Sequence, residues 1–151
     1  MLDIVLAENL AKPDGLDSLA PAQSLKNFSE IANAASARNA IKRKGALLHS
    51  SSYEIEDGVL LELAARGGAV LFSFSDVLHE RGFRRGIILS KMRLLLSAAR
   101  KRKCGFAVCT LAKKPEELRN ARELTAFAAV LGFSDVERKD AERRMGELVR
   151  A

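Results

Sequence analysis

The chain has 151 residues, of which 48% are hydrophobic and 29% are charged. These values are typical of a globular domain, so they exclude wholesale disorder and predict a single domain over residues 1–151. No apolar run approaches the ~20 residues of a membrane helix, and the N-terminus lacks a signal-peptide pattern. We therefore expect a cytoplasmic protein with no membrane partner.

Positive charge is concentrated in the second half of the chain. Residues 1–79 hold seven bases and ten acids, whereas residues 80–151 hold eighteen bases and nine acids. The two parts therefore carry net charges of −3 and +9, which suggests a polyanion facing one part of the surface. The alternative is a basic surface that is merely solvated.

Cys104 and Cys109 lack metal-ligand spacing and are expected to be reduced thiols.

The first half alternates short apolar runs with helical patterns. We expect buried strands at 2–7, 28–34 and 46–50. A weak helical pattern at 16–25 is interrupted by Pro21, and Gly45 ends a short helix over 35–44. Asp57 is expected to cap a helix that runs to about residue 66, with Leu60, Leu61 and Leu63 on its buried side.

The second half repeats the alternation with clearer patterns. An unbroken apolar run predicts a strand at 69–74 that is covered on both faces, and a second run predicts a strand at 106–110. Apolar residues at 88, 92, 95 and 99 predict a helix over 86–103. A helix from Pro115 to Leu131 should end at Gly132. The sequence from Ser134 to Glu137 predicts the capping box of a last helix, with Val136, Met145 and Leu148 inward. Alternation of this kind predicts an α/β fold with a parallel sheet.

The stretch from Ala69 to Arg122 carries the functional hypothesis. Between Arg81 and Arg122 there are thirteen Lys or Arg residues and two acids. The loops that follow parallel strands gather at one end of the sheet, so bases after the strands at 69–74 and 106–110 are expected on one side of the molecule. We call this set the basic rim; it comprises Arg81, Arg84, Arg85, Lys113, Lys114 and Arg119. Cations of this kind neutralise phosphates, so the basic rim is expected to face a polyanion.

Two other basic clusters have competing explanations. The run 100–103 lies where a helix ends, so it either contacts the polyanion or complements the helix dipole, and both interpretations stay open. Arg138, Lys139, Arg143 and Arg144 alternate with acids on the last helix and are expected to form a solvated face.

A series of short segments, in a fixed order from Arg38 to Val149, carries a family resemblance. The segments are Arg38-Asn39, Ala46-Leu-Leu-His49, Leu60-Leu-Glu-Leu-Ala-Ala65, Val70-Leu-Phe-Ser-Phe74, Arg84-Arg85, Val108-Cys-Thr110, Glu117-Leu-Arg119, Arg122-Glu-Leu124 and Val130-Leu-Gly132. In this order they resemble the thirty-kilodalton protein subunit of archaeal and eukaryal ribonuclease P, called protein component three in archaea. The loop Thr110-Leu111-Ala112 departs from the Ser-Gly-Ala usual in that family, and Arg38-Asn39 reverses its Asn-Arg order.

The resemblance implies a fold and a function. The fold would be a (β/α) barrel-type, TIM-like domain with parallel strands, shortened at the N-terminal side by roughly 60 residues against an ordinary barrel. The protein would be a non-catalytic subunit of ribonuclease P, the endoribonuclease that removes the 5′ leader from precursor tRNA. Its partners would be the ribonuclease P RNA, the precursor tRNA within the complex, a small ferredoxin-like subunit and other subunits.

The resemblance also bears on site residues and cofactors. It implies that the polyanion is RNA, so the basic rim and four further residues, Arg38, Lys42, Arg43 and Arg122, are expected to bind RNA. The chain itself is expected to hold no metal, no cofactor and no catalytic residue, because the RNA subunit would bind the magnesium ions.

Two alternative functions remain. A barrel-type metal-dependent phosphoesterase needs several His and Asp ligands at strand ends, and here only His49, His79 and Asp76 come near that pattern. A scaffold protein without direct RNA contact would hold its small partner subunit in place. The chain has one tyrosine and no tryptophan, so base stacking is not expected to be the main mode of RNA binding.

Overall fold

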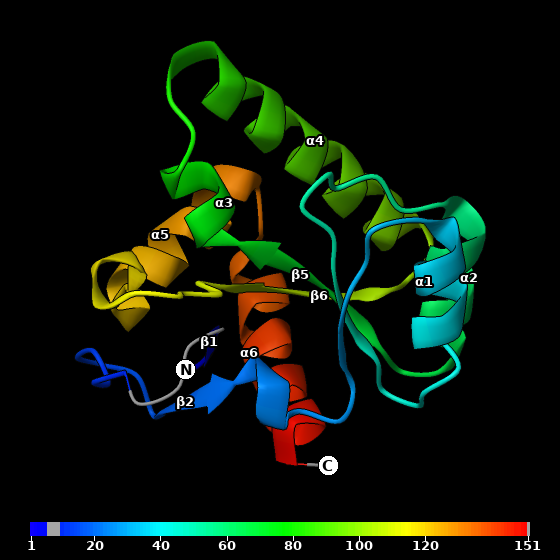
Figure 1. Cartoon of the computed structure of the whole chain (residues 1–151), viewed down its shortest axis with the longest axis horizontal. Helices are drawn as coiled ribbons and strands as arrows, with labels where there is room; N and C mark the ends of the chain where they lie inside the picture. Colours follow the sequence, from blue (N-terminus) through cyan, green and yellow to red (C-terminus); the bar gives the residue numbers. More distant parts are fainter. Residues whose placement is uncertain (6–9, 151) are drawn as a thin grey trace.

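The computed structural model describes residues 1–5 and 10–150, and Figure 1 shows a mixed α/β fold. Its strands are β1 (Leu2–Val5), β2 (Ser18–Pro21), β3 (Phe28–Glu30), β4 (Leu47–His49), β5 (Ala69–Ser73) and β6 (Gly105–Cys109). Its α-helices are α1 (Ala34–Ala40), α2 (Asp57–Ala65), α3 (Phe74–Leu78), α4 (Gly82–Lys101), α5 (Ala121–Leu131) and α6 (Asp135–Arg150). Two 3-10 turns, η1 (Ala22–Ser24) and η2 (Pro115–Glu117), complete the order.

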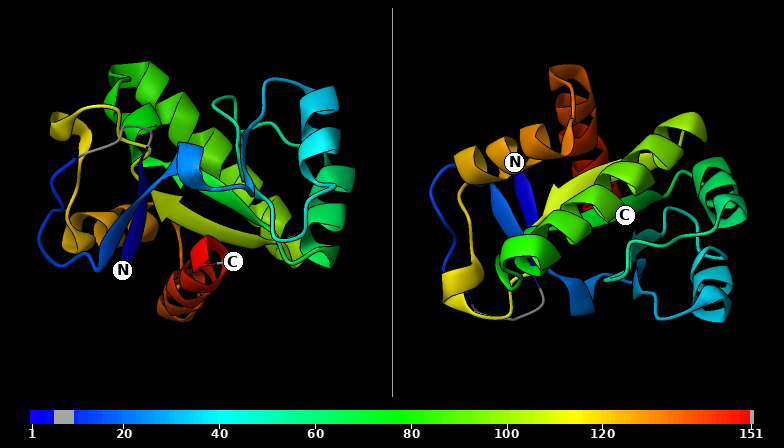
Figure 2. Two further views of the ribbon diagram at one scale, coloured as in Figure 1. Left: turned by 60° about the horizontal axis from the view of Figure 1, so that its bottom comes forward. Right: turned by 90° about the horizontal axis from the view of Figure 1, so that it is seen from above.

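All strand pairs are parallel, as the alternation predicts. One sheet has the order β3-β4-β5-β6 and the other pairs β1 with β2. Every residue of β5 is buried, which confirms the prediction of a strand covered on both faces. Helices α4, α5 and α6 all contact β6. In Figure 1, α4 runs along the top of the molecule above β5 and β6, and Figure 2 shows it from two further sides.

Aromatic rings connect the sheet to the elements around it. The Phe72 ring of β5 stacks on Tyr53 and meets Phe133 edge-on, with ring centroids 6.0 and 6.1 Å apart. The Phe133 ring also meets Phe106 of β6 at 5.0 Å. Offset stacked and edge-to-face pairs at these separations add about 0.5–1.5 kcal/mol each beyond the area they bury. The rings therefore bind the chain before α6 to the centre of the sheet.

Most of the predicted elements are confirmed with shorter bounds. The strands near 28, 46, 69 and 106 form as expected, and the residues from 6 onward in the first predicted strand lie outside the described part. The capping box of α6 is present, since Ser134 Oγ accepts from the Glu137 amide at 3.2 Å and Glu137 accepts from the Ser134 amide at 2.8 Å. Gly132 ends α5 in the left-handed region at a φ of 101°.

Four predictions about helices are wrong. Residues 18–21 form a strand and not part of a helix, because parallel pairing with β1 satisfies their backbone, and Pro21 falls at the strand end where proline is tolerated. α4 begins at Gly82 and is preceded by the short α3, so Arg84 and Arg85 lie in its first turns and not in a loop. The predicted helix 115–131 is broken, because Leu118 is extended and Asn120 caps α5. Glu56, not Asp57, holds the cap position of α2.

Two side chains predicted to face inward are exposed. Leu61 is 55% exposed and Val136 is 78% exposed. Both sit in helices whose other apolar residues fill the inner face, so helical geometry turns these two toward solvent.

Strand β1 lies beside the end of β6 and is linked to it through the residues that follow. The Leu111 amide donates to the Ile4 carbonyl at 2.9 Å. The Asp3 carboxylate accepts from the Thr110 amide at 2.7 Å and from the Thr110 hydroxyl at 2.6 Å. Among the described residues no strand pairing joins β6 to β1 or β2 to β3, so the structure consists of two parallel sheets and does not show a closed barrel.

The Asp3 carboxyl is buried in this link, and burial raises its pKa from 3.8 to about 6 although Thr110 hydrogen bonds oppose the rise. A raised pKa means that the folded state holds the proton more tightly than the unfolded chain does. This tighter proton binding adds to the free energy of unfolding. Its contribution is fully present below pH 3.8 and is lost as pH rises toward 6.

We predict that Asp3→Asn removes this pH dependence. The difference in unfolding free energy between the natural chain and the variant should fall by at most about 3 kcal/mol as pH rises from about 4 to about 7. Urea unfolding of both proteins over that range measures the difference. A difference that stays constant or grows with pH would contradict the burial of an ionisable Asp3.

Candidate nucleic-acid interface

The ends of β5 and β6 bring two distant basic segments to one side of the molecule. Ser73 pairs with Cys109 at the last position of the two strands. Just beyond it, the Thr110 carbonyl accepts from the Ser73 hydroxyl at 3.1 Å and from the Ser75 amide at 3.2 Å. The segments that carry Arg81 to Arg85 and Lys113 to Arg122 both leave from these ends, as the sequence predicts.

Two contacts hold these segments together beyond the sheet. The Arg119 guanidinium lies over the Phe74 ring of α3, 5.1 Å from its centroid. His79 Nε2 lies 2.7 Å from Glu117 Oε1, and Glu117 Oε2 also accepts from the Lys113 amide at 2.6 Å. The segment after β6 is therefore fixed against α3 and the turn that follows it, and this sets where the backbone of each basic segment lies.

Five of the candidate bases are exposed and carry no ion pair or side-chain hydrogen bond among the residues that the structure describes. They are Arg81, Arg84, Lys113, Lys114 and Arg122. Unpaired cations on one side of a protein raise the local positive potential, and phosphate binding lowers that energy. These five residues are the part of the site that has charge available for RNA.

The other two members of the basic rim have structural roles. Arg85 Nε donates to the carbonyls of Glu80 at 2.8 Å and Val77 at 3.2 Å, which satisfies acceptors at the end of α3. Arg119 Nη1 donates to the carbonyls of Leu118 at 2.6 Å and Glu116 at 2.8 Å. Their guanidinium groups shape the loops and leave fewer donors for a ligand.

Arg38, Lys42 and Arg43 lie apart from the basic rim. Arg38 is in α1 and faces Glu56 at 3.7 Å, with both side chains exposed. Lys42 and Arg43 follow α1 and precede β4, at the opposite ends of the strands. Figure 1 shows α1 and α2 on one side of the molecule and α3 and α5 on the other. The structure therefore does not bring the ten candidate residues into one surface.

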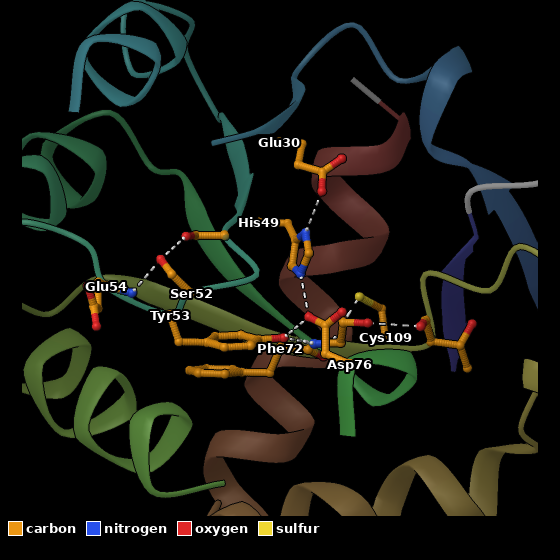
Figure 3. A network of polar contacts seen from close by, with 11 residues as sticks. Glu30, His49, Ser52, Tyr53, Glu54, Phe72, Asp76 and Cys109 are labelled. Atoms are coloured by element: carbon orange, nitrogen blue, oxygen red, sulfur yellow. Dashed lines mark hydrogen bonds and ion pairs between the residues drawn. The ribbon is translucent and has the colours of Figure 1, made fainter. Parts of the chain in front are cut away.

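A buried polar network lies behind the strand ends (Figure 3). His49 Nε2 lies 2.8 Å from Asp76 Oδ2, and the Tyr53 hydroxyl donates to the same oxygen at 2.5 Å. The Tyr53 oxygen also accepts from the Ser73 amide at 3.1 Å. Burial and the adjoining Asp76 carboxylate raise the pKa of the Tyr53 phenol, so the hydroxyl stays protonated and keeps its donor role.

This network connects four segments of the chain. It is not an arrangement of metal ligands. His49 Nδ1 lies 3.8 Å from Glu30 Oε1 and is buried without a hydrogen-bond partner. Across the described ranges, no group of three or more His, Cys, Asp or Glu side chains is arranged to hold a metal ion. The network does, however, bring together His49 and Asp76, the two residues that the sequence placed at strand ends.

Sequence reasoning missed two parts of this region. Tyr53 is in the left-handed backbone region at a φ of 54°, and nothing in its local pattern indicates that its hydroxyl turns inward. The Asp3–Thr110 pair spans 107 positions, so only a three-dimensional arrangement reveals it. An acid inside the apolar run of β1 was the one available signal, since a buried charge needs a partner.

None of the described helices combines the length and apolar character needed to cross a membrane.

Comparison with known proteins gives one informative match. No family model matches the chain. Ribonuclease P protein component 3 of Methanosarcina mazei is 37% identical over 84 residues, which is 55% of this chain and 35% of the relative. Over that segment, the chain resembles a ribonuclease P protein. The chain spans about a third of the relative's length, so the resemblance is partial.

We predict different outcomes for two bases of the rim. Arg119→Ala removes two hydrogen bonds to carbonyls and a contact with the Phe74 ring, so it should destabilise the fold by about 1–2 kcal/mol. Arg84→Ala should change stability by less than about 0.5 kcal/mol, because its side chain is exposed and unpaired in the described part of the chain. Urea unfolding compares the two variants. Equal losses would contradict the division into structural and available bases.

Proposed function

We propose that this protein is a subunit of ribonuclease P and that it contacts RNA through the basic rim. The single observation that carries the proposal is that unpaired cations follow β5 and β6 at the same end of the sheet, Arg81 and Arg84 at the start of α4 and Lys113 and Lys114 after β6, in a chain that is similar to a ribonuclease P protein component. The sequence alone suggests the grouping, and the pairing of Ser73 with Cys109 gives it a physical cause.

Phosphate contact is the binding mode that the surface favours. Arg81, Arg84, Lys113 and Lys114 present donors to solvent, and each neutralised phosphate releases counterions. The single tyrosine is buried in the polar network, so it offers no exposed ring for base stacking. Recognition of the backbone and shape of a folded RNA fits these residues better than recognition of base edges.

The finer parts of the proposal follow from the same assignment. We propose that the chain is not itself catalytic, that the RNA holds the magnesium ions of the reaction, and that the complex is cytoplasmic. We also propose that the two parallel sheets form one side of a barrel-type domain. The link from Asp3 to Thr110 supports this arrangement, because it continues the strand order from β6 to β1.

The test is reconstitution of precursor-tRNA processing. Removal of the 5′ leader should be measured with the RNA subunit and its other proteins, in the presence and absence of this chain. We expect the chain to raise cleavage and to show no cleavage when incubated alone with magnesium. Metal-dependent turnover by the chain alone would favour the phosphoesterase alternative instead.

A triple variant tests the rim itself. Arg84→Ala, Lys113→Ala and Lys114→Ala remove three available cations and break no ion pair or side-chain hydrogen bond among the described residues. The dependence of log affinity for the RNA subunit on log salt should become shallower by about 2–3, since each phosphate contact contributes about 0.7–0.9. Circular dichroism should be unchanged.

The matched control removes three exposed bases elsewhere, through Lys101→Ala, Lys103→Ala and Lys139→Ala. The control should retain most of the slope. An equal loss in both variants would mean that binding follows net charge and not the position of the rim.

A second function, support of a partner subunit, is favoured by the outer side of α4. Phe83 is 85% exposed and Leu94 is 72% exposed, and Ile87 lies between them on the same helical stripe. The relative is named as one component of an assembly, which suggests protein partners for this chain as well. Because Arg84 borders the stripe, the partner is expected to present an apolar face with acidic residues beside it.

The stripe should make the isolated chain self-associate. Light scattering at increasing concentration should show species larger than a monomer, and Phe83→Glu with Leu94→Glu should return the chain to a monomer. Val136→Glu on α6 is the control, because Val136 is equally exposed at 78% but lies outside the stripe. A monomeric natural chain at all concentrations would contradict this function for α4.

A further inference from the structure

A second positively charged surface lies at the other ends of the strands. An open groove of about 950 Å³ runs between the segment around η1 and the C-terminal part of α6. Four of its lining residues are bases, namely Lys26, Arg43, Lys44 and Arg150. Lys26 precedes β3, and Arg43 and Lys44 precede β4, so this groove opens at the N-terminal ends of the strands. The basic rim follows the C-terminal ends of β5 and β6, so the two surfaces are separate.

The charge in the groove is not balanced by neighbouring acids. No Asp or Glu is among the lining residues in the part of the chain that the structure describes. Lys26 and Lys44 form no ion pair with any described residue. Asp17 is not part of the lining; its pKa is lowered mainly by the hydrogen bond from the amino terminus, and the charge of Arg150 is the weakest of the causes. Four cations that repel one another in the free protein would be stabilised by an anion.

The walls of the groove are cross-linked by hydrogen bonds. The Asn27 side-chain amide donates to the Gly45 carbonyl at 2.8 Å and to the Leu148 carbonyl at 3.2 Å. Arg43 Nη1 donates to the Lys26 carbonyl at 2.7 Å. Gly45 has a φ of +66°, a backbone conformation that residues with a side chain rarely adopt, so glycine suits this wall beside Leu148 of α6. A groove held in this way loses little conformational entropy when a ligand binds.

The floor of the groove adds an apolar surface to the charge. Ala22, Leu25, Phe28 and Val149 line it, and the Phe28 ring is half-buried. Cations around an apolar floor with an aromatic ring match an unpaired nucleic-acid strand, in which phosphates meet the cations and a base meets the ring. A double helix presents only its phosphates and sugars at such a surface, and an acidic peptide has no base to place on the floor.

We propose that this groove binds a single-stranded RNA segment, independently of the basic rim. The inference deepens the proposed function, because it takes RNA as the polyanion, and it adds a second contact site for an unpaired stretch. Lys26, Lys44 and Arg150 hold phosphates, Phe28 contacts a base, and Asn27 and Arg43 keep the walls in position.

The test is binding of a fluorescent oligouridylate of about 12 nucleotides, a length suited to grooves of this class. The groove variant combines Lys26→Glu, Lys44→Glu and Arg150→Glu, which leaves the hydrogen bonds of Asn27 and Arg43 in place. The control variant reverses the same number of charges through Lys101→Glu, Lys103→Glu and Lys139→Glu. Fluorescence anisotropy between about 50 and 200 mM salt gives the affinity and its salt slope.

We expect the groove variant to bind the oligouridylate at least about tenfold more weakly than the control variant, with a slope shallower by about 2. Thermal unfolding checks that both variants fold. A 4-thiouridine version of the probe should cross-link to the peptide that contains Phe28 in the natural chain, and Phe28→Ala should reduce that adduct. Equal weakening in the groove and control variants, or cross-links confined to residues 81–122, would overturn the proposal.

Further probes separate this proposal from the alternatives and from the function of the rim. A duplex RNA of the same length, or polyglutamate, should compete poorly for the groove, and competition as strong as that of unlabelled oligouridylate would also overturn it. The Arg84→Ala, Lys113→Ala, Lys114→Ala variant should keep its affinity for the oligouridylate. If this chain does not raise leader removal but still binds the oligouridylate in the groove, the proposed function fails and the groove proposal stands. If leader removal rises but the groove variant binds the oligouridylate as well as the control variant does, the groove proposal fails and the proposed function stands.

Discussion

The parallel pairing of β5 with β6 is the interaction on which the rest of the structure depends. Five residue pairs, from Ala69 with Gly105 to Ser73 with Cys109, align the two strands over their whole length. This alignment makes both strands end at the same edge of the sheet. The Thr110 carbonyl accepts from Ser73, and the Thr110 amide and hydroxyl donate to Asp3, so Thr110 links both strand ends to β1. The position of the basic rim is thus set by backbone hydrogen bonds and not by attraction between the loops, whose like charges repel.

The basic residues divide into two groups with different physical roles. Arg85 of α4 donates to main-chain carbonyls at the end of α3, and Arg119 donates to carbonyls of its own loop, so both hold the backbone around them. Arg84, Lys113 and Lys114 have no such contacts within the described residues and are left for a ligand. High charge density alone does not identify a binding residue, because arginine at a helix end or loop is also an effective donor to unsatisfied carbonyls.

Much of the fold could be predicted from the sequence because the pattern is local. The buried runs of β5 and β6, the apolar face of α4 and the capping box of α6 depend on residues within a few positions of one another. β2 was missed because pairing with β1 overrides the weak helical pattern around Pro21. The start of α4 was missed because Gly82 and the exposed Phe83 give no inward-facing pattern in its first turn.

The candidate site was only partly predictable for the same reason. The rule that loops after parallel strands share one end predicted that the segments of Arg81 to Arg85 and Lys113 to Arg119 leave from the same end of the sheet, and the register of β5 with β6 agrees. The same rule separates them from Lys42 and Arg43, which precede β4, although all of these residues were RNA-binding candidates. The groove beside Asn27 depends on contacts between residues 27, 45 and 148, and no local pattern contains that information.

The contact of Arg119 with Phe74 has a consequence for how this surface can change over time. A lysine there would keep the charge but would lose the planar fork that reaches two carbonyls while lying over a ring. The positions of Lys113 and Lys114 impose no such geometry. In sequences that diverge from this one, we therefore expect positions 113 and 114 to accept either lysine or arginine, or to lose the base to a nearby position. Position 119 should keep arginine, because only a guanidinium makes both sets of contacts.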